Sequence, residues 1–280
     1  MLKKATRLYF FIAIIVAISA VTFWRISVNM SANKANSLNA VQSNEKVPKA
    51  EQLNLEEENG YIKCTIQRAV LWVEKDYLND DEIKEMADRI DKGINKAEEY
   101  IGIKLDEQYT IDNKIHYYIK DGNFRSYAEA EKGIAHLSHA KDKLSPYIHE
   151  AIHIIAKDWY ATWLHEGLAV HLNDRLEGWP SYPNFGTDVD ELSRNYINGE
   201  FDNILKLVGD NTFISGFGSE KERMAFYILS GSFVRFLDNN LGTDQLMKIY
   251  AAEDPIAEIQ SATGKSMEEW KKMWIDGLLK

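Results

Sequence analysis

Residues 145–174 read SPYIHEAIHIIAKDWYATWLHEGLAVHLND, and this stretch decides how the second half of the chain folds. Ser145 is a candidate N-cap, and Pro146 suits the first turn of a helix because its missing N–H would be unpaired there. Isoleucines at 148, 152 and 155 recur at helical spacing, so we expect them to form the buried face. The stretch therefore predicts a helix that begins near Ser145.

Two histidines lie on the stripe next to that buried face. His149 and His153 are four residues apart, which places their side chains on one side of a helix. Two imidazoles at this spacing can bind one zinc ion at about 2.0–2.1 Å each. Glu150 follows the first histidine and can reach a water molecule at such an ion without binding the ion itself. The pattern predicts a metal site with Glu150 as general base.

A third ligand is expected from the helix that follows. The first helix should end near Asp158, and a second should begin with Thr162 as its cap. If the two helices fold back on each other, His153 and Glu166 each lie roughly 6–8 Å from the turn, at a rise of 1.5 Å per residue. Gly167 supports a close approach, since glycine inside a helix costs roughly 1 kcal/mol relative to Ala. Glu166 is therefore the candidate third ligand.

Other interpretations of the two histidines are weaker. They could be two surface side chains on an amphipathic helix without a metal. A metzincin pattern would need Gly at 156 and His at 159, and the chain has Ala156 and Trp159 instead. One zinc ion per chain, bound by His149, His153 and Glu166, is the prediction.

The first 60 residues look different from the rest. Residues 8–24 carry no charge, follow a basic leader at 1–7, and are long enough for a short membrane-spanning helix, which needs roughly 17–25 residues. We expect a single-pass signal anchor with the leader in the cytoplasm and the body outside the cell membrane. A signal peptide cleaved within residues 1–20 would instead give a secreted protein. Residues 25–60 are polar and are predicted to be a flexible linker.

The body, residues 61–280, is predicted to be one α+β domain. Its first part, 61–143, should contain a small mixed sheet and a long helix, and its second part, 144–280, should be mostly helical. Strands are expected at 61–67, 69–73, 115–119 and 133–138. A long helix is expected to begin at a cap within Asn79-Asp80-Asp81, to run to about Tyr100 and to be closed by Gly102. Further helices are expected at 224–237, 244–251 and 266–279.

Charge and cysteine content exclude several classes of protein. The formal net charge of the whole chain is −10, which argues against nucleic-acid binding because phosphate contacts need clustered Lys and Arg. Cys64 is the one cysteine, so no intramolecular disulfide and no zinc site of several thiolates is possible. It alternates with polar neighbours, and we expect it to be buried.

The motifs HEAIH and WLHEGLA together resemble the gluzincin metallopeptidases, in particular the peptidase MA-like group. The resemblance covers about residues 61–280, with further similarity at 226–237 and 264–270. It implies a zincin-like fold, Glu166 as third ligand, and an edge strand, at 133–138, along which an extended substrate lies. Many thermolysin-like members carry Asp where this chain has Val170; Asp174 could replace it.

The resemblance implies hydrolysis of peptide bonds in a peptide or protein substrate. The transition state needs a further donor for the developing oxyanion. Tyr227 is the first candidate, although it could equally be a core aromatic, and His171 is the second. We expect His165 to point away from the metal, and His136 and His139 to be satisfied or solvent-exposed.

Two other functions are compatible with the sequence. The protein could be a binding or regulatory protein on a peptidase fold that has lost catalysis, although all four central residues are intact. It could also be a zinc hydrolase of a non-peptide substrate such as a cell-wall component. The sequence predicts neither the cleavage preference nor the oligomeric state.

Overall fold

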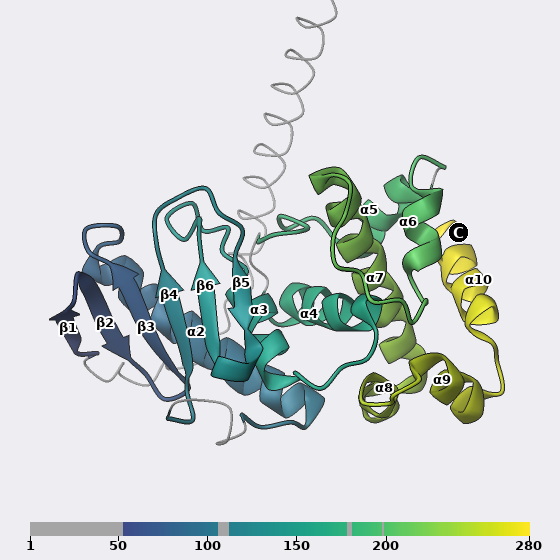
Figure 1. The fold of residues 1–280 in the computed structure, drawn as a ribbon, viewed down its shortest axis with the longest axis horizontal. Coiled ribbons are helices and arrows are strands. Elements are labelled where there is room, and N and C mark those ends of the chain that lie inside the picture. Colours follow the sequence, from purple (N-terminus) through teal and green to yellow (C-terminus); the bar gives the residue numbers. More distant parts are fainter. Residues whose placement is uncertain (1–52, 106–111, 178–180, 198) are drawn as a thin grey trace, which may run out of the picture. The chain divides into compact units, whose positions relative to one another are not determined.

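The computed structural model describes residues 53–105, 112–177, 181–197 and 199–280, which belong to one compact unit, Glu51–Lys280. Its first part is a six-stranded sheet in the order β1-β2-β3-β4-β6-β5 (Figure 1). The strands are β1 Leu55–Glu58, β2 Tyr61–Thr65, β3 Ala69–Glu74, β4 Ile115–Ile119, β5 Tyr127–Glu129 and β6 Ile134–Leu137. Strands β3, β4 and β6 run parallel, while β1, β2 and β5 pair antiparallel with their neighbours, so the sheet is mixed as predicted.

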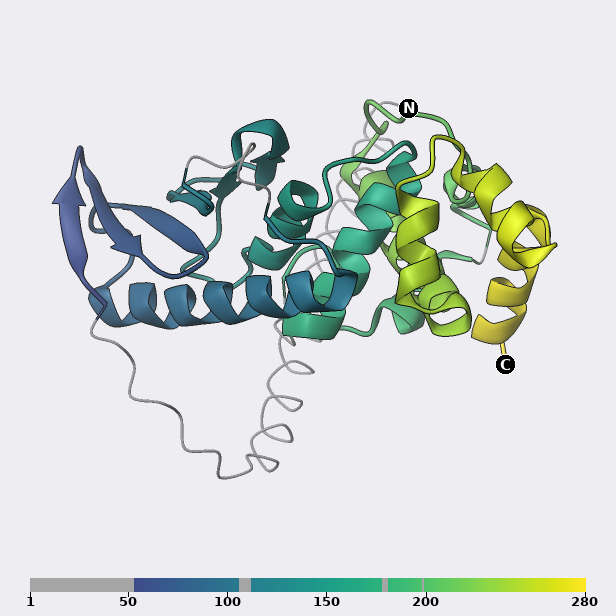
Figure 2. The same cartoon turned by 90° about the horizontal axis from the view of Figure 1, so that it is seen from below.

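The long helix α2, Asp80–Ile101, connects the parallel strands β3 and β4 and lies along one face of the sheet (Figure 2). Asn79 caps it through a capping box with Glu82, and Gly102 ends it in the left-handed conformation. Its apolar side chains are buried together with alternate side chains of β3 and β4. The predicted helix and its two ends are confirmed.

The second part of the chain is helical after the short 3-10 helix η1, Ala130–Lys132, and strand β6. The helices are α3 Tyr147–Ile155, α4 Thr162–Glu177, α5 Val189–Tyr196, α6 Asp202–Leu207, α7 Glu220–Leu241, α8 Thr243–Tyr250, α9 Pro255–Thr263 and α10 Met267–Leu278. The helices expected at 224–237, 244–251 and 266–279 are therefore present, as α7, α8 and α10.

Helices α4 and α7 make the closest contact in this part. A Cβ atom on Gly167 would lie 2.6 Å from Val234 Cγ2 and 2.7 Å from the Ser230 carbonyl oxygen, so no larger residue fits without displacement of α7. Gly167 thus marks a close approach, but to α7 and not, as expected, to α3 across the hairpin. It fixes the helix that carries Glu166 against the helix that carries Tyr227.

One part of the predicted fold class, the transmembrane helix, has to be corrected. Among the residues that the structure describes, none of the helices combines the length and apolar composition needed to cross a bilayer. The segment 8–24, on which the prediction of a membrane-anchored, extracytoplasmic protein was based, lies outside those residues, as do the leader 1–7 and most of the linker 25–60. The fold class, and the localisation that was built on a spanning helix, are therefore corrected to a described structure without such a helix.

Smaller differences concern the edges of elements. Residues 55–58, inside the stretch predicted as a linker, form β1 because they pair with β2. Ser145 does not cap α3: its hydroxyl donates to the Ser138 carbonyl, and Pro146 occupies the N-cap position. The strand at 133–138 exists as β6, but it is not an edge strand, because it pairs with β4 on one side and β5 on the other. Cys64 is fully buried, as expected.

Candidate metal centre

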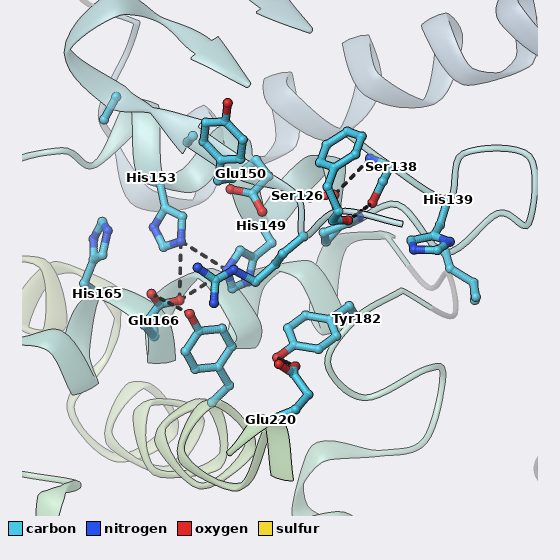
Figure 3. A pocket seen from close by; sticks show the side chains of 18 of the residues that line it. Ser126, Ser138, His139, His149, Glu150, His153, His165, Glu166, Tyr182 and Glu220 are labelled. Carbon is cyan, nitrogen blue, oxygen red and sulfur yellow. Dashed lines mark hydrogen bonds and ion pairs between the residues drawn. The ribbon is translucent and has the colours of Figure 1, made fainter. Parts of the chain in front are cut away.

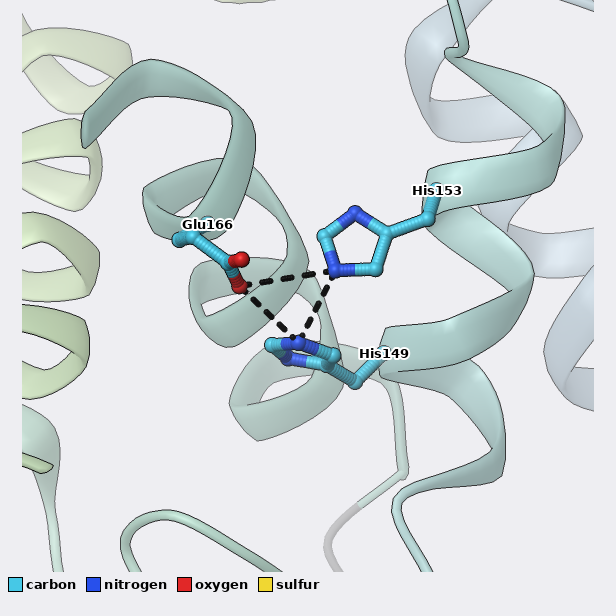
Figure 4. A group of neighbouring side chains, drawn as sticks. All are labelled: His149, His153 and Glu166. Atoms are coloured by element: carbon cyan, nitrogen blue, oxygen red, sulfur yellow. Dashed lines mark hydrogen bonds and ion pairs between the residues drawn. The ribbon is translucent and has the colours of Figure 1, made fainter. Parts of the chain in front are cut away.

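Helices α3 and α4 form a hairpin that brings three side chains together. His149 and His153 project from α3 toward Glu166 on α4 (Figure 4). The Nε2 atoms of the two histidines are 3.1 Å apart. Glu166 Oε2 lies 3.3 Å from His149 Nε2 and 3.4 Å from His153 Nε2. The three side chains predicted as ligands therefore form one group that could hold a metal ion.

The dimensions of this triangle fit a small tetrahedral cation. An ion bound at about 2.0–2.1 Å in tetrahedral geometry separates its ligand atoms by about 3.3–3.4 Å. The three observed separations of 3.1, 3.3 and 3.4 Å are close to that value. The ligand atoms are thus already positioned for one ion, without a change of rotamer.

The hydrogen bonding of the group also fits a cation. Glu166 Oε2 is buried and has no hydrogen-bond partner among the described residues, although it faces both imidazoles. An unsatisfied buried carboxylate oxygen is costly, and a bound cation removes that cost. The donor set of two imidazoles and one carboxylate is one that catalytic zinc sites use.

Glu150 lies beside the histidines in the same cavity (Figure 3). Glu150 is buried, with 4% of its surface exposed. Burial raises the pKa of Glu150, and the neighbouring imidazoles of His149 and His153 act against that rise. A carboxylate with a raised pKa is better suited to accept and return a proton near neutral pH than an exposed one.

Tyr227 reaches the site from α7, and its contact there is with Glu166, one of the three candidate metal ligands. Its hydroxyl donates to Glu166 Oε1 at 3.0 Å, and its ring stacks on His149 with centroids 5.9 Å apart. Burial and the neighbouring Glu166 raise the pKa of Tyr227. Tyr227 therefore stays protonated and holds the Glu166 carboxylate in its orientation.

The metal group opens onto a cavity of about 810 Å³. The strand β5 and the loop before it line one wall, and helices α3, α4 and α7 line others. Tyr182 and Glu220 close a further wall, where the Tyr182 hydroxyl donates to Glu220 Oε1 at 3.0 Å (Figure 3). The cavity is large enough for a peptide segment of a few residues.

The remaining candidate histidines fall into two sets. We expected His165 to point away from the metal, and this expectation is wrong. The centroid of its ring lies 4.0 Å from that of His153 and 4.3 Å from that of Trp159, and His165 lines the cavity. His171 is buried against Asp238, with His171 Nε2 2.8 Å from Asp238 Oδ2, and is not among the described residues that line the cavity. The prediction that His171 could reach an oxyanion is therefore wrong.

Three other predicted positions can now be placed. Asp174 does not contact a metal histidine; it pairs with Arg235 and accepts a hydrogen bond from Asn184 at 2.6 Å. His136 lies 2.9 Å from the Glu129 carboxylate. His139 is half-buried, lies 3.7 Å from the Asp142 carboxylate and lines the cavity.

Several residues that shape the site carry no signal in the sequence. Asn173 accepts a hydrogen bond from the His149 backbone N–H at 3.3 Å and donates to Ser181 at 2.7 Å. The edge strand β5 is three residues long, too short to show alternation. Arg125 and Tyr182 come from loops, where no periodicity indicates a partner.

Comparison with known proteins adds no family assignment. No protein-family model matches the chain, and no curated protein matches it either.

Proposed function

We propose that the chain is a zinc-dependent metallopeptidase that hydrolyses peptide bonds in a peptide or protein substrate. The observation that carries the proposal is the convergence of His149, His153 and Glu166 on one point, with the Glu150 carboxylate buried beside them. Three protein ligands leave a fourth position free, which is typical of catalytic zinc sites and not of structural ones. The resemblance of HEAIH and WLHEGLA to gluzincins supports the same conclusion.

His149, His153 and Glu166 would hold the zinc ion, which supplies Lewis-acid chemistry: it acidifies water and polarises a carbonyl group. Glu150 accepts the proton of the attacking water and returns it to the leaving amine. Its burial supports this role, because burial raises the pKa of Glu150 and so favours the uptake of a proton. Tyr227 keeps Glu166 in place through the hydrogen bond to Oε1.

The outer strand of the sheet offers a place for the substrate. Strand β5 is at the end of the sheet order and pairs only with β6 among the described strands, and its residues Tyr127 and Ala128 line the cavity. An edge strand presents unpaired N–H and C=O groups, to which an extended peptide can pair. A peptide bound in this way passes the metal group within one cavity.

The test compares the purified full chain with its Glu150→Gln variant. Both should bind one zinc ion per chain, because Glu150 is not a ligand, whereas hydrolysis of a denatured protein should fall by about 10²–10⁴-fold in the variant. Glu253→Gln makes the same change at an exposed position and serves as the matched control. Equal hydrolysis by wild type and Glu150→Gln would contradict the mechanism, and zinc binding without hydrolysis by the wild type would favour a binding protein.

A further inference from the structure

A single arginine side chain lines the cavity of the metal group. Arg125 lies in the loop between β4 and β5, two residues before the edge strand begins. Among the described residues that line this cavity, it is the one Lys or Arg. The chain as a whole is acidic, with 43 Asp and Glu against 33 Lys and Arg, so the positive charge of Arg125 is opposite in sign to the net charge of the chain.

Arg125 has no protein partner within the described part of the chain. It is exposed toward solvent and forms neither a hydrogen bond nor an ion pair with the residues that the structure describes. Other arginines are paired: Arg235 with Asp174 and Asp188, and Arg223 with Glu220. The guanidinium of Arg125 is therefore available to a ligand.

Arg125 shares its cavity with the residues of the proposed mechanism. The lining of this cavity includes Arg125, Glu150 on α3 and Tyr227 on α7, together with the three side chains of the metal group. A group bound by Arg125 therefore lies in the same cavity as the position where the scissile bond would lie.

The carboxylates of the cavity wall are already in use. Glu166 faces the two histidines and accepts from Tyr227, and Glu220 accepts from Tyr182 and Arg223. Glu150 must remain free of a tight ion pair in order to accept a proton. No carboxylate among the described lining residues is left to neutralise Arg125, so the missing anion is best supplied by the substrate.

We propose that Arg125 binds a carboxylate of the substrate and directs the site to peptides with a negative charge beside the scissile bond. The planar guanidinium matches a carboxylate with two parallel hydrogen bonds, and such pairs are stronger than bonds to a neutral carbonyl. The carboxylate has two sources, the C-terminus of the peptide or an Asp or Glu side chain. The inference rests on the proposed function, since it takes the substrate to be a peptide.

The cleavage test uses three peptides of one sequence: a free C-terminal acid, the C-terminal amide, and the amide with one Asn near the cleavage site replaced by Asp. Wild type should cleave one of the two charged peptides with a kcat/KM about 10–100-fold above that of the neutral amide. Whichever charged peptide is preferred identifies the source of the carboxylate. Arg125→Met should remove the preference, so that the three peptides are cleaved with similar kcat/KM, and Arg125→Lys should keep part of it.

Lys221→Met is the matched control for charge. It removes one positive charge from an exposed lysine that does not line the cavity in the described structure, so the preference should persist. Two results would overturn the proposal: a wild type without preference, or an Arg125→Met variant that loses kcat equally on all three peptides. The second result would make Arg125 a group that stabilises the oxyanion of every substrate.

A binding measurement separates this inference from the proposed function. The probes are acetyl-Ala-Ala with a free carboxylate and its amide, titrated calorimetrically into the zinc-loaded Glu150→Gln chain, with and without the additional Arg125→Met substitution. The chain that keeps Arg125 should favour the acid over the amide by about 10-fold or more relative to the chain that carries Arg125→Met. If this coupling is present but wild type hydrolyses no peptide, the proposed function fails and the Arg125 site stands. If wild type hydrolyses peptides but the coupling is absent, the Arg125 site fails and the proposed function stands.

Discussion

Two clusters of similar composition involve helix α4 and have different consequences. Each contains a carboxylate that contacts histidine and accepts a hydrogen bond from a tyrosine: Glu166 with Tyr227, and Asp238 with Tyr100 and His171. Burial acts to raise the pKa of both carboxylates, but their histidine neighbours and hydrogen bonds outweigh it, so the pKa of each is lowered. Composition alone does not tell the two clusters apart.

The difference lies in how completely the acceptors are satisfied. Asp238 accepts from Tyr100 through Oδ2 and from Thr243 through Oδ1 at 3.0 Å, with His171 on the same carboxylate. Glu166 Oε2, in contrast, is left without a hydrogen bond among the described residues and faces two imidazole nitrogens. A carboxylate whose two oxygens are satisfied stabilises the fold, whereas a carboxylate oxygen that is left open beside two imidazoles can bind a cation.

The largest expected effect separates the two clusters by metal binding. His153→Ala should lower zinc affinity by more than the roughly 10–100-fold that outer-shell changes cost, because a ligand is lost. His171→Ala should keep the zinc and lower the free energy of unfolding instead, because it leaves Asp238 short of a partner. Zinc titration against a competing chelator measures the first effect and urea denaturation the second. Wild-type zinc affinity in His153→Ala would mean that the triad is not the metal site.

A smaller effect is expected from the two tyrosines. Tyr227→Phe should reduce zinc affinity about 10–100-fold, because the orientation of the ligand Glu166 is less fixed. Tyr100→Phe should lower the free energy of unfolding by about 1.5–3 kcal/mol, since a hydrogen bond to a buried carboxylate is lost, and should leave zinc affinity unchanged. The same two assays check both variants. A change of equal size in both assays for both variants would remove the distinction between the clusters.

The smallest effect concerns the pH dependence of stability in the closed cluster. Burial lowers the pKa of His171 even though Asp238 acts against it. The unfolded chain, with a histidine pKa of about 6.5, therefore takes up a proton before the folded one, and stability is full above that pH and falls as the pH decreases. His171→Asn should show a weaker fall between about pH 8 and pH 5 in urea denaturation with chelator present. Equal slopes for wild type and variant would contradict this account.

The sequence was sufficient for the local parts of the structure. The Asn79 cap, the Gly102 end of α2 and the strands β2, β3, β4 and β6 follow from capping chemistry and from spacings of two and about four residues. The spacing of His149 and His153 likewise places them on a common face of one helix. The predicted transmembrane helix at 8–24, in contrast, was drawn from composition, and the described structure contains no helix of that kind.

Long-range relations were beyond the sequence because no local pattern encodes them. The sequence placed β6 at the edge of the sheet, but the three-residue strand β5 pairs beyond it and takes the edge position. Asp174 was expected near the metal histidines and instead pairs with Arg235, 61 residues away. His165 was expected to point away from the metal, and its ring instead packs on that of His153.

The sequence by itself determined which candidate metal-binding side chains of α3 share a face, because residue identity and helical periodicity decide which donors exist and where they lie on a helix. One turn of helix is enough to fix how His149, Glu150 and His153 lie relative to one another. Only the tertiary structure decided that Glu166 closes the triangle, that the Tyr227 hydroxyl donates to it, and that Arg125 faces the same cavity without a partner among the described residues. Those relations depend on how α4 packs on α3 and α7 and on where loops lie, and packing is a property of the whole fold.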